Sequence, residues 1–196
     1  MVITIGREYG AGGRSVAAKL SQRLGIEYYD VDFTRLTSKV SGYSEEEVLR
    51  LGEDMSNRSK LFGQIIDGIT SRTRSVEAIY QAQRDVVITL SKQPCIIVGR
   101  CSNIILREEN IPSLDVFLYA KKSFRLKRAA ELAENGEEDL SKYVDRRDQL
   151  RNTYYKVFTS YTMDDTNGYN ICLDTGTLGI DRCVDILVYA AKPYFS

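Results

Sequence analysis

The residues with the clearest chemical potential form a glycine-rich segment near the N-terminus, G-R-E-Y-G-A-G-G-R-S at residues 6–15. Glycine lacks a Cβ and takes positive φ, so four glycines within eight residues let successive backbone N–H groups converge on one anion. A helix beginning there adds free amide donors and the positive end of its dipole. The segment predicts a phosphate-binding loop made of Gly10, Ala11, Gly12, Gly13, Arg14 and Ser15.

The loop departs from the common phosphate-binding pattern G-x-x-x-x-G-K-[ST], because it contains no lysine. Two alignments are open. If residues 13–15 replace G-K-S, Arg14 takes the catalytic role of the lysine and Ser15 binds the metal ion. If Gly12 is the last loop glycine, as in kinases whose loop ends G-K-G-T, Gly13 occupies the lysine position and Arg14 follows it. We slightly prefer the first alignment, and a glycine-rich turn without a ligand is the remaining alternative.

Three further charged residues follow apolar runs of the sequence. Asp30 and Asp32 come after residues 26–29, and Arg100 comes after residues 95–98. Carboxylates suit Mg²⁺ or an acceptor hydroxyl, and a guanidinium can hold a phosphate through two hydrogen bonds. We predict that all three residues bind the phosphoryl acceptor. The alternatives are helix capping by Asp32 and a structural ion pair for Arg100.

A charged, tyrosine-rich stretch between residues 135 and 159 contains Arg147 and Arg151. These arginines are four residues apart and share one face of a helix. Clustered guanidinium groups can neutralise the charge of a transferring phosphoryl group, so we predict catalytic roles for both. The alternative is an ordinary solvated helix face. Residues 121–160 form the candidate lid.

The elements that must position these residues are predicted from the apolar pattern. Runs near residues 2–5, 26–30, 94–98, 114–119 and 169–173 predict about five buried strands. Strands that alternate with helices indicate an α/β fold, with helices on both faces of a parallel sheet. Ligands of such sheets bind beyond the carboxyl ends of the strands, and the candidate residues fall at that edge.

Helical patterns occupy most of the segments between these strands. They predict a first helix after the glycine loop, a second through Lys39, a capped helix at 45–53, one or two helices within 61–90 with an interruption near 70–75, a basic helix at 123–134 and a closing helix at 178–191.

Composition narrows the classes of function. A chain of 196 residues fits one domain, residues 1–196, and its zero net charge argues against nucleic-acid and membrane partners. Without a signal-peptide pattern or an apolar stretch of about 20 residues, we expect a cytoplasmic protein. The chain has no histidine, which removes the commonest general base and leaves chemistry based on arginines, carboxylates and Mg²⁺. The four scattered cysteines are expected to be free thiols.

The motifs, taken in order, resemble the cytidylate kinase-like family of P-loop nucleoside monophosphate kinases. The resemblance rests on residues 6–15, Tyr29-Asp30, Val98-Gly99-Arg100 and Arg147-Asp148-x-x-Arg151, and it covers nearly the whole chain. It implies a P-loop NTPase fold of three layers with a helical lid. It also implies that Mg²⁺ and ATP serve phosphoryl transfer to a nucleoside monophosphate, or to a related small phosphorylated metabolite.

The resemblance also implies individual roles. Residues 10–15 would hold the donor phosphates, Asp30 would lie near the acceptor, Arg100 would bind the acceptor phosphate, and Arg147 and Arg151 would bridge donor and acceptor. The chain departs from cytidylate kinases at the missing lysine, at Cys101 in place of an aspartate, and at Val31-Asp32 in place of Ser/Thr-Gly.

Other functions remain to be weighed. The main alternative is a non-catalytic nucleotide or phosphate sensor that keeps the kinase fold, which the missing lysine favours. A GTPase-like switch lacks its Asn-Lys-x-Asp run, and a dehydrogenase lacks the G-x-G-x-x-G spacing. The expected partners are a nucleotide and a small-molecule acceptor, and the oligomeric state is left open.

Overall fold

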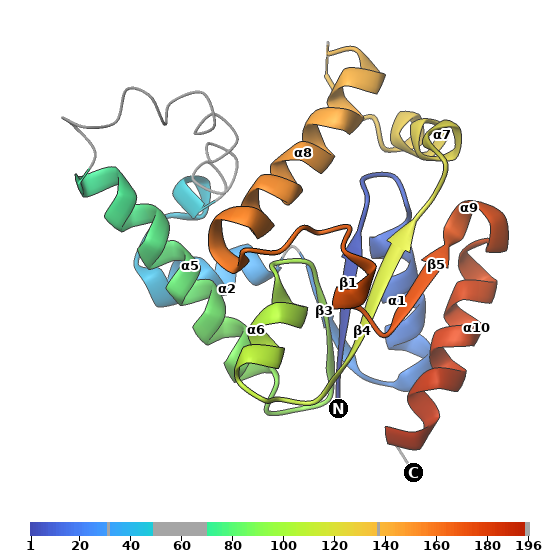
Figure 1. Ribbon diagram of the computed structural model, residues 1–196, viewed down its shortest axis with the longest axis horizontal. Helices are drawn as coiled ribbons and strands as arrows, with labels where there is room; N and C mark the ends of the chain where they lie inside the picture. Colours follow the sequence, from blue (N-terminus) through green and yellow to red (C-terminus); the bar gives the residue numbers. More distant parts are fainter. Residues whose placement is uncertain (31, 49–69, 137, 195–196) are drawn as a thin grey trace.

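A parallel sheet of five strands occupies the centre of the molecule (Figure 1). The structure is a computed structural model and describes residues 1–30, 32–48, 70–136 and 138–194. The strands are β1 (Val2–Arg7), β2 (Glu27–Tyr29), β3 (Cys95–Val98), β4 (Ser113–Tyr119) and β5 (Ile171–Asp174). Their spatial order is β2-β3-β1-β4-β5, with every neighbouring pair parallel. The predicted three-layer α/β fold is confirmed.

Helices follow the strands and cover both faces of the sheet. They are α1 (Gly13–Leu24), α2 (Asp32–Ser41), α5 (Thr70–Leu90), α6 (Ser102–Glu108), α7 (Lys122–Leu132), α8 (Leu140–Thr159), α9 (Thr175–Leu178) and α10 (Ile180–Ala191), with 3-10 turns at Thr166–Gly168 and Lys192–Tyr194. Helices α1 and α10 lie on one face, and α5 and α6 lie on the other (Figure 1). Helix α8 crosses the upper edge of the sheet, where α7 accompanies it.

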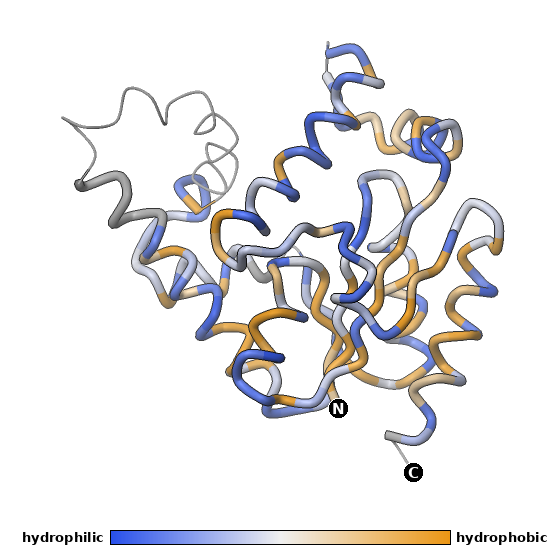
Figure 2. The backbone as a smooth tube through the Cα atoms, viewed as in Figure 1, coloured by the Kyte–Doolittle hydropathy of each residue, from blue (hydrophilic) through white to orange (hydrophobic). Residues whose placement is uncertain are grey.

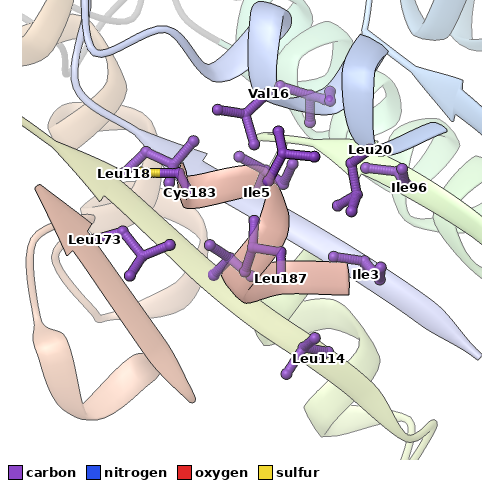
Figure 3. Packing of buried hydrophobic residues seen from close by; sticks show 14 of the residues in the cluster. Ile3, Ile5, Val16, Leu20, Ile96, Leu114, Leu118, Leu173, Cys183 and Leu187 are labelled. Carbon is purple, nitrogen blue, oxygen red and sulfur yellow. The ribbon is translucent and has the colours of Figure 1, made fainter. Parts of the chain in front are cut away.

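The side chains of β1 alternate between the two faces of the sheet, and apolar residues pack on both faces. Ile3 and Ile5 are fully buried against α1 and α10, where they meet Val16, Leu20 and Leu187 (Figure 3). Val2 belongs instead to the cluster under α5 and α6. Successive side chains of a strand point to opposite faces, so an unbroken apolar run is the pattern expected of a strand covered on both sides.

The register of the sheet brings the ends of its central strands level with one another. Ile5 of β1 pairs with Val98, the last residue of β3, and Arg7 pairs with Leu118 near the end of β4. The segments that follow these strands therefore start at the same edge. The strands themselves consist largely of hydrophobic residues, whereas the upper part of α8 is largely hydrophilic (Figure 2).

Two helix predictions need correction, and one observed helix was not predicted. The predicted closing helix is divided at Gly179, whose φ of 78° ends α9 and starts α10. The predicted interruption near residues 70–75 is wrong, because α5 runs unbroken from Thr70 to Leu90. Serine and threonine lower helix propensity by only about 0.5 kcal/mol each relative to alanine, a cost too small to end a helix by itself. Helix α6 was not predicted, since its seven residues give too short a pattern.

The predicted capping box at Ser44 is present. Ser44 N–H donates to Glu47 Oε2 at 2.9 Å, and Glu47 N–H donates to Ser44 Oγ at 3.2 Å. Residues 45–48 are helical, and the remainder of the predicted helix at 45–53 lies outside the described residues, as do residues 61–69. The four cysteines are free thiols, as expected. Within the described segments, no helix is both long and apolar enough to cross a bilayer.

Candidate active site

The glycine-rich segment forms a tight loop between β1 and α1. Gly10 has φ 81° and Gly12 has φ 83°, and Gly12 is the N-cap of the helix. An ideal Cβ on Gly10 would lie 2.5 Å from the carbonyl oxygen of Arg125, so only glycine fits there. The loop therefore depends on glycine both for its left-handed backbone and for the close approach of α7.

The start of α1 presents unused amide donors. The first helical hydrogen bond runs from Val16 N–H to Gly12 O at 2.9 Å. Among the residues that the structure describes, the N–H groups of Gly13, Arg14 and Ser15 have no hydrogen-bond acceptor. These donors, together with the helix dipole, favour an anion at this end of the helix.

Tyr9 connects the loop to the candidate lid. Its N–H donates to Asp148 Oδ1 at 2.6 Å, and its hydroxyl donates to Glu134 Oε2 at 2.6 Å. Arg125 Nη1 donates to Tyr9 O at 3.2 Å. Burial and the bond to Glu134 raise the pKa of Tyr9, so its hydroxyl stays protonated and serves as a donor. One loop residue thus binds both α7 and α8.

Two arginines of α7 also reach the loop. Arg125 forms ion pairs with Asp148 and, at 3.2 Å, with Glu8. Only 8% of Arg125 is exposed, so it is a buried structural cation and not part of a solvated basic face. Arg128 Nη2 donates to Ser15 Oγ at 3.1 Å. Helices α7 and α8 are therefore held against the loop by polar contacts.

A cavity of about 240 Å³ opens beside the loop at the carboxyl edge of the sheet. It is lined by Gly6, Arg7, Arg14, Asp30, Thr34, Gly99, Arg100, Arg147, Leu150, Arg151, Tyr154, Tyr155 and Met163. Five of these residues are arginines, and Asp30 is the one acid among the described lining residues. Such an excess of positive charge suits a ligand with several negative charges.

The lining contains every predicted catalytic arginine and two of the predicted acceptor residues. Arg14, Arg147 and Arg151 come together with Asp30 and Arg100, although they are distant in the sequence. Gly10, Ala11, Gly12, Gly13 and Ser15 belong to the adjoining loop and helix start, outside this lining. Asp32 begins α2, and its side chain is outside the described part of the structure.

Asp30 is held by two guanidinium groups. Arg14 Nε lies 2.5 Å from Asp30 Oδ2, and Arg7 Nη2 lies 3.3 Å from Asp30 Oδ1. Arg14 also pairs with Glu134, which follows α7, at 3.2 Å. The Arg14 side chain thus points to Asp30 and Glu134 and links the end of β2 to the segment after α7.

Arg100 stands on an unusual backbone. Gly99, Arg100 and Cys101 have φ values of 79°, 63° and 52°, so three successive residues are left-handed. Non-glycine residues in this region each cost on the order of 1–3 kcal/mol, and such costs concentrate at functional sites. The turn from β3 into α6 therefore bears strain while it places Arg100 in the cavity lining.

Arg147 and Arg151 lie over an aromatic ring of the loop. Their guanidinium carbons are 5.8 Å and 5.4 Å from the centroid of the Tyr9 ring, within the range of cation–π contact. Arg151 Nη1 also donates to Arg7 O at 3.4 Å and lies 3.6 Å from Asp148. Burial and the nearby Arg7 charge lower the pKa of Arg151, which marks a site where a bound anion would relieve repulsion.

Arg7, Tyr154 and Tyr155 line the cavity although the sequence motifs do not predict them. Arg7 ends a buried strand at the ligand-binding edge, the same signal that identified Arg100. The tyrosines belong to the part of α8 that packs against the body, and Tyr155 OH donates to Asn103 Oδ1 at 3.0 Å. Their place in the lining follows from the path of α8 across the sheet edge.

Comparisons with known proteins agree with this architecture. A crystal structure of an uncharacterized protein from Eubacterium ventriosum aligns with a TM-score of 0.68 and 23% identity, over 98% of each chain. Shikimate kinase from Bacteroides thetaiotaomicron aligns with a TM-score of 0.58 and 12% identity, also over 98% of each chain. Deoxyadenosine kinase from M. mycoides with bound dATP has a TM-score of 0.52 and 11% identity, over 98% of this chain and 100% of its own.

These likenesses establish the fold as that of the P-loop kinases. A search of curated protein sequences finds no significant match. A family model described as the cytidylate kinase-like family matches residues 2–177. This match and the fold together support phosphotransfer of the kinase type, with nucleotide or small-metabolite substrates. The chain therefore belongs to the cytidylate kinase-like family.

Proposed function

We propose that this protein transfers the γ-phosphoryl group of ATP, with Mg²⁺, to a nucleoside monophosphate or a related small phosphorylated metabolite. The observation that carries the proposal is the convergence of five arginines on one cavity beside a glycine-rich helix start. Phosphoryl transfer requires positioning and charge neutralisation more than a protein nucleophile, and this cavity offers both.

The donor side of the proposed site is the loop and the start of α1. The unused amides of Gly13, Arg14 and Ser15, with the left-handed turn at Gly10 and Gly12, suit the phosphates of a nucleotide. The helix begins directly after Gly12, which favours the alignment that puts Gly13 at the lysine position. We infer that residues 10–15 bind the donor phosphates.

The chain also fits a phosphate-bound Mg²⁺. In the described residues, no group of three or more histidine, cysteine or acidic side chains could enclose a metal ion. Mg²⁺ in kinases takes most of its ligands from phosphates and water, so one protein oxygen suffices. Ser15 Oγ at the helix start would supply it once its hydrogen bond from Arg128 is released. When bound, Mg²⁺ neutralises charge on the phosphate oxygens.

The acceptor side is formed by Asp30, Arg100 and the wall from α8. Arg100 binds the acceptor phosphate, and Asp30 holds an acceptor hydroxyl or orients the guanidinium groups around it. Leu150 and Tyr154 supply apolar surface. Because the side chain of Asp32 is not described, we keep it as a candidate for the same side.

In the proposed step, an acceptor oxygen forms a bond to the γ-phosphorus while the bond from that phosphorus to the β–γ bridging oxygen breaks. ADP leaves with the electron pair, and an acceptor phosphate oxygen attacks as an anion with no proton to remove. Arg147 and Arg151 neutralise the charge spread over the transferring group. Residues 121–160 act as the lid that brings these arginines over the acceptor and excludes water.

The test is a screen of ATP consumption against nucleoside monophosphates and small phosphorylated metabolites. With an acceptor in hand, Arg100→Ala should raise the acceptor KM by about 10- to 100-fold, the loss expected for a charge-assisted hydrogen bond. Arg182→Ala, an exposed arginine on α10 outside the cavity lining, is the matched control and should keep wild-type kinetics.

The outcomes separate the two candidate functions. ATP consumption that depends on one acceptor and on Arg100 supports the kinase. Binding of ATP without transfer to any acceptor in the panel would replace the kinase with the nucleotide sensor, which the missing lysine favours. An unchanged acceptor KM in Arg100→Ala would remove Arg100 from the acceptor site.

A further inference from the structure

The Arg7 side chain occupies the space that a side chain at position 13 would need. An ideal Cβ on Gly13 would lie 2.8 Å from Arg7 Cγ, closer than real Cβ atoms come to other atoms, and 3.2 Å from Arg7 Cδ, which is a tight contact. Gly13 is the first residue of α1, directly after the last loop glycine, Gly12. The common pattern G-x-x-x-x-G-K-[ST] has its lysine at that position. In this chain, the side chain of a neighbouring strand fills the place.

Arg7 also occupies the position of the first glycine in the same pattern. Counted back from Gly12, the first glycine of G-x-x-x-x-G coincides with Arg7. The chain thus has arginine where the pattern has glycine, and glycine where the pattern has lysine. The two departures are complementary in space, because the missing side chain at Gly13 makes room for the added one at Arg7.

The guanidinium of Arg7 extends over the floor of the cavity. An ideal Cβ on Gly99 would lie 2.0 Å from Arg7 Nη1, so the glycine after β3 is needed for this position. Arg7 Nη2 lies 3.3 Å from Asp30 Oδ1, and 16% of the side chain is exposed. Arg14 is 56% exposed and is held between Asp30 and Glu134. Of the two arginines, Arg7 is the one fixed between the helix start and the acceptor side.

We propose that Arg7 supplies the cation that a lysine supplies in the common loop, and that it binds the β- and γ-phosphate oxygens of the donor. This assignment rests on the proposed function, since it names a catalytic residue for that reaction. A planar guanidinium held by packing offers two parallel hydrogen bonds to phosphate with little loss of freedom. Burial lowers the pKa of Arg7, because its positive charge is removed from water. A bound polyanion would stabilise that charge.

The test exchanges the two positions. Arg7→Ala should weaken binding of the non-hydrolysable ATP analogue AMP-PNP with Mg²⁺ by about 10- to 100-fold in calorimetry. It should also slow single-turnover transfer by at least about 100-fold. The double variant Arg7→Gly with Gly13→Lys restores the first glycine and the lysine of the common pattern, with Arg14 still at its Ser/Thr position, and should recover both quantities to within about tenfold of wild type. Arg23→Ala, an exposed arginine further along α1, is the matched control.

A ligand-free measurement checks the packing argument. Gly13→Lys alone should lower Tm by roughly 2–10 °C, because its Cβ meets the Arg7 stem, and adding Arg7→Gly should restore it. If Arg7→Ala is too unstable to assay, Arg7→Lys and the exchanged variant decide through AMP-PNP binding. Both should bind better than Arg7→Gly alone.

Several outcomes would overturn the assignment. The first is an AMP-PNP affinity of Arg7→Ala equal to that of the wild type. The second is an AMP-PNP affinity of the exchanged variant no higher than that of Arg7→Gly. The third is a Tm of Gly13→Lys equal to that of the wild type. Wild-type protein that fails to bind AMP-PNP would overturn it as well. Wild-type protein that binds AMP-PNP but transfers nothing would refute the proposed kinase activity only, because the binding arm still tests Arg7.

Discussion

The aliphatic core under α1 and α10 and the junction between the loop and the lid are built by opposite means. The core joins buried residues of four strands and two helices, such as Ile3, Leu20 and Leu187, through non-directional packing (Figure 3). The junction has a small apolar cluster around Tyr9 and Tyr143, and is otherwise held by ion pairs and hydrogen bonds. The burial of apolar surface is a non-directional force, whereas hydrogen bonds and ion pairs depend on direction and can be exchanged for those of a ligand.

This difference explains how a rigid sheet edge can support a site whose polar contacts can be replaced by those of a ligand. Arg125 pairs with Asp148 and Glu8, and these ion pairs hold α7 and α8 on the loop. The sheet edge beneath stays fixed, because its strands are packed on both faces. Four substitutions separate the two regions.

The largest effect is expected in the core. Leu187→Ala removes a fully buried side chain from α10 and should lower the free energy of unfolding by about 2–5 kcal/mol. Urea denaturation followed by circular dichroism measures the loss. Ile186→Ala, the neighbouring and partly exposed residue, should cost clearly less. Substrate KM should not change at a temperature where Leu187→Ala is folded, and a large shift in KM would show that core and site are coupled.

Arg151→Ala should have the opposite effect: a large loss of activity with little or no loss of stability. Removing a guanidinium that acts on the transferring group is expected to lower kcat by about 10²- to 10³-fold, or roughly 2.7–4 kcal/mol. Stability should hold or rise, because Arg7 and Arg147 repel Arg151. Steady-state kinetics and a thermal melt measure the two effects. Arg146→Ala, at an exposed arginine of the same helix, is the control. If Arg151→Ala keeps the wild-type kcat, Arg151 takes no part in the reaction.

Asp148→Asn should loosen the junction without touching the core. The ion pair with Arg125 is lost while an oxygen remains for the Tyr9 N–H, and a hydrogen bond to a charged group contributes about 1.5–3 kcal/mol. Hydrogen exchange should increase in α8 but not in α10. Asp145→Asn breaks an exposed pair between the same two helices and should cost about 0–1 kcal/mol. Equal exchange in both variants would contradict the role of Asp148.

Tyr9→Phe is the mildest change. It keeps the ring beneath Arg147 and Arg151 and removes only the hydroxyl that donates to Glu134, so the free energy of unfolding should fall by about 0.5–1.5 kcal/mol. Chemical denaturation measures the change, with Tyr161→Phe at an exposed position as control. A fall in kcat beyond tenfold would show that the hydroxyl, and not the ring, positions the lid arginines.

The sheet was predictable because its signals are local. Continuous apolar runs identify strands covered on both faces, and the edge rule for parallel sheets then places Asp30 and Arg100 together. The short helix α6 and the break at Gly179 were missed, because seven residues carry little periodicity and one glycine inside a helical pattern is ambiguous. The roles proposed for the site residues remain predictions.

The amino-acid sequence alone determined the alternation of strands and helices, the glycine loop and the arginine-rich composition of the site. Only the tertiary structure decided where each guanidinium points: Arg14 to Asp30 and Glu134, Arg7 across Gly13 and Gly99. The physical reason is that secondary structure follows from patterns within a few residues. A long charged side chain instead takes the direction set by space and opposite charge from segments far away in the chain.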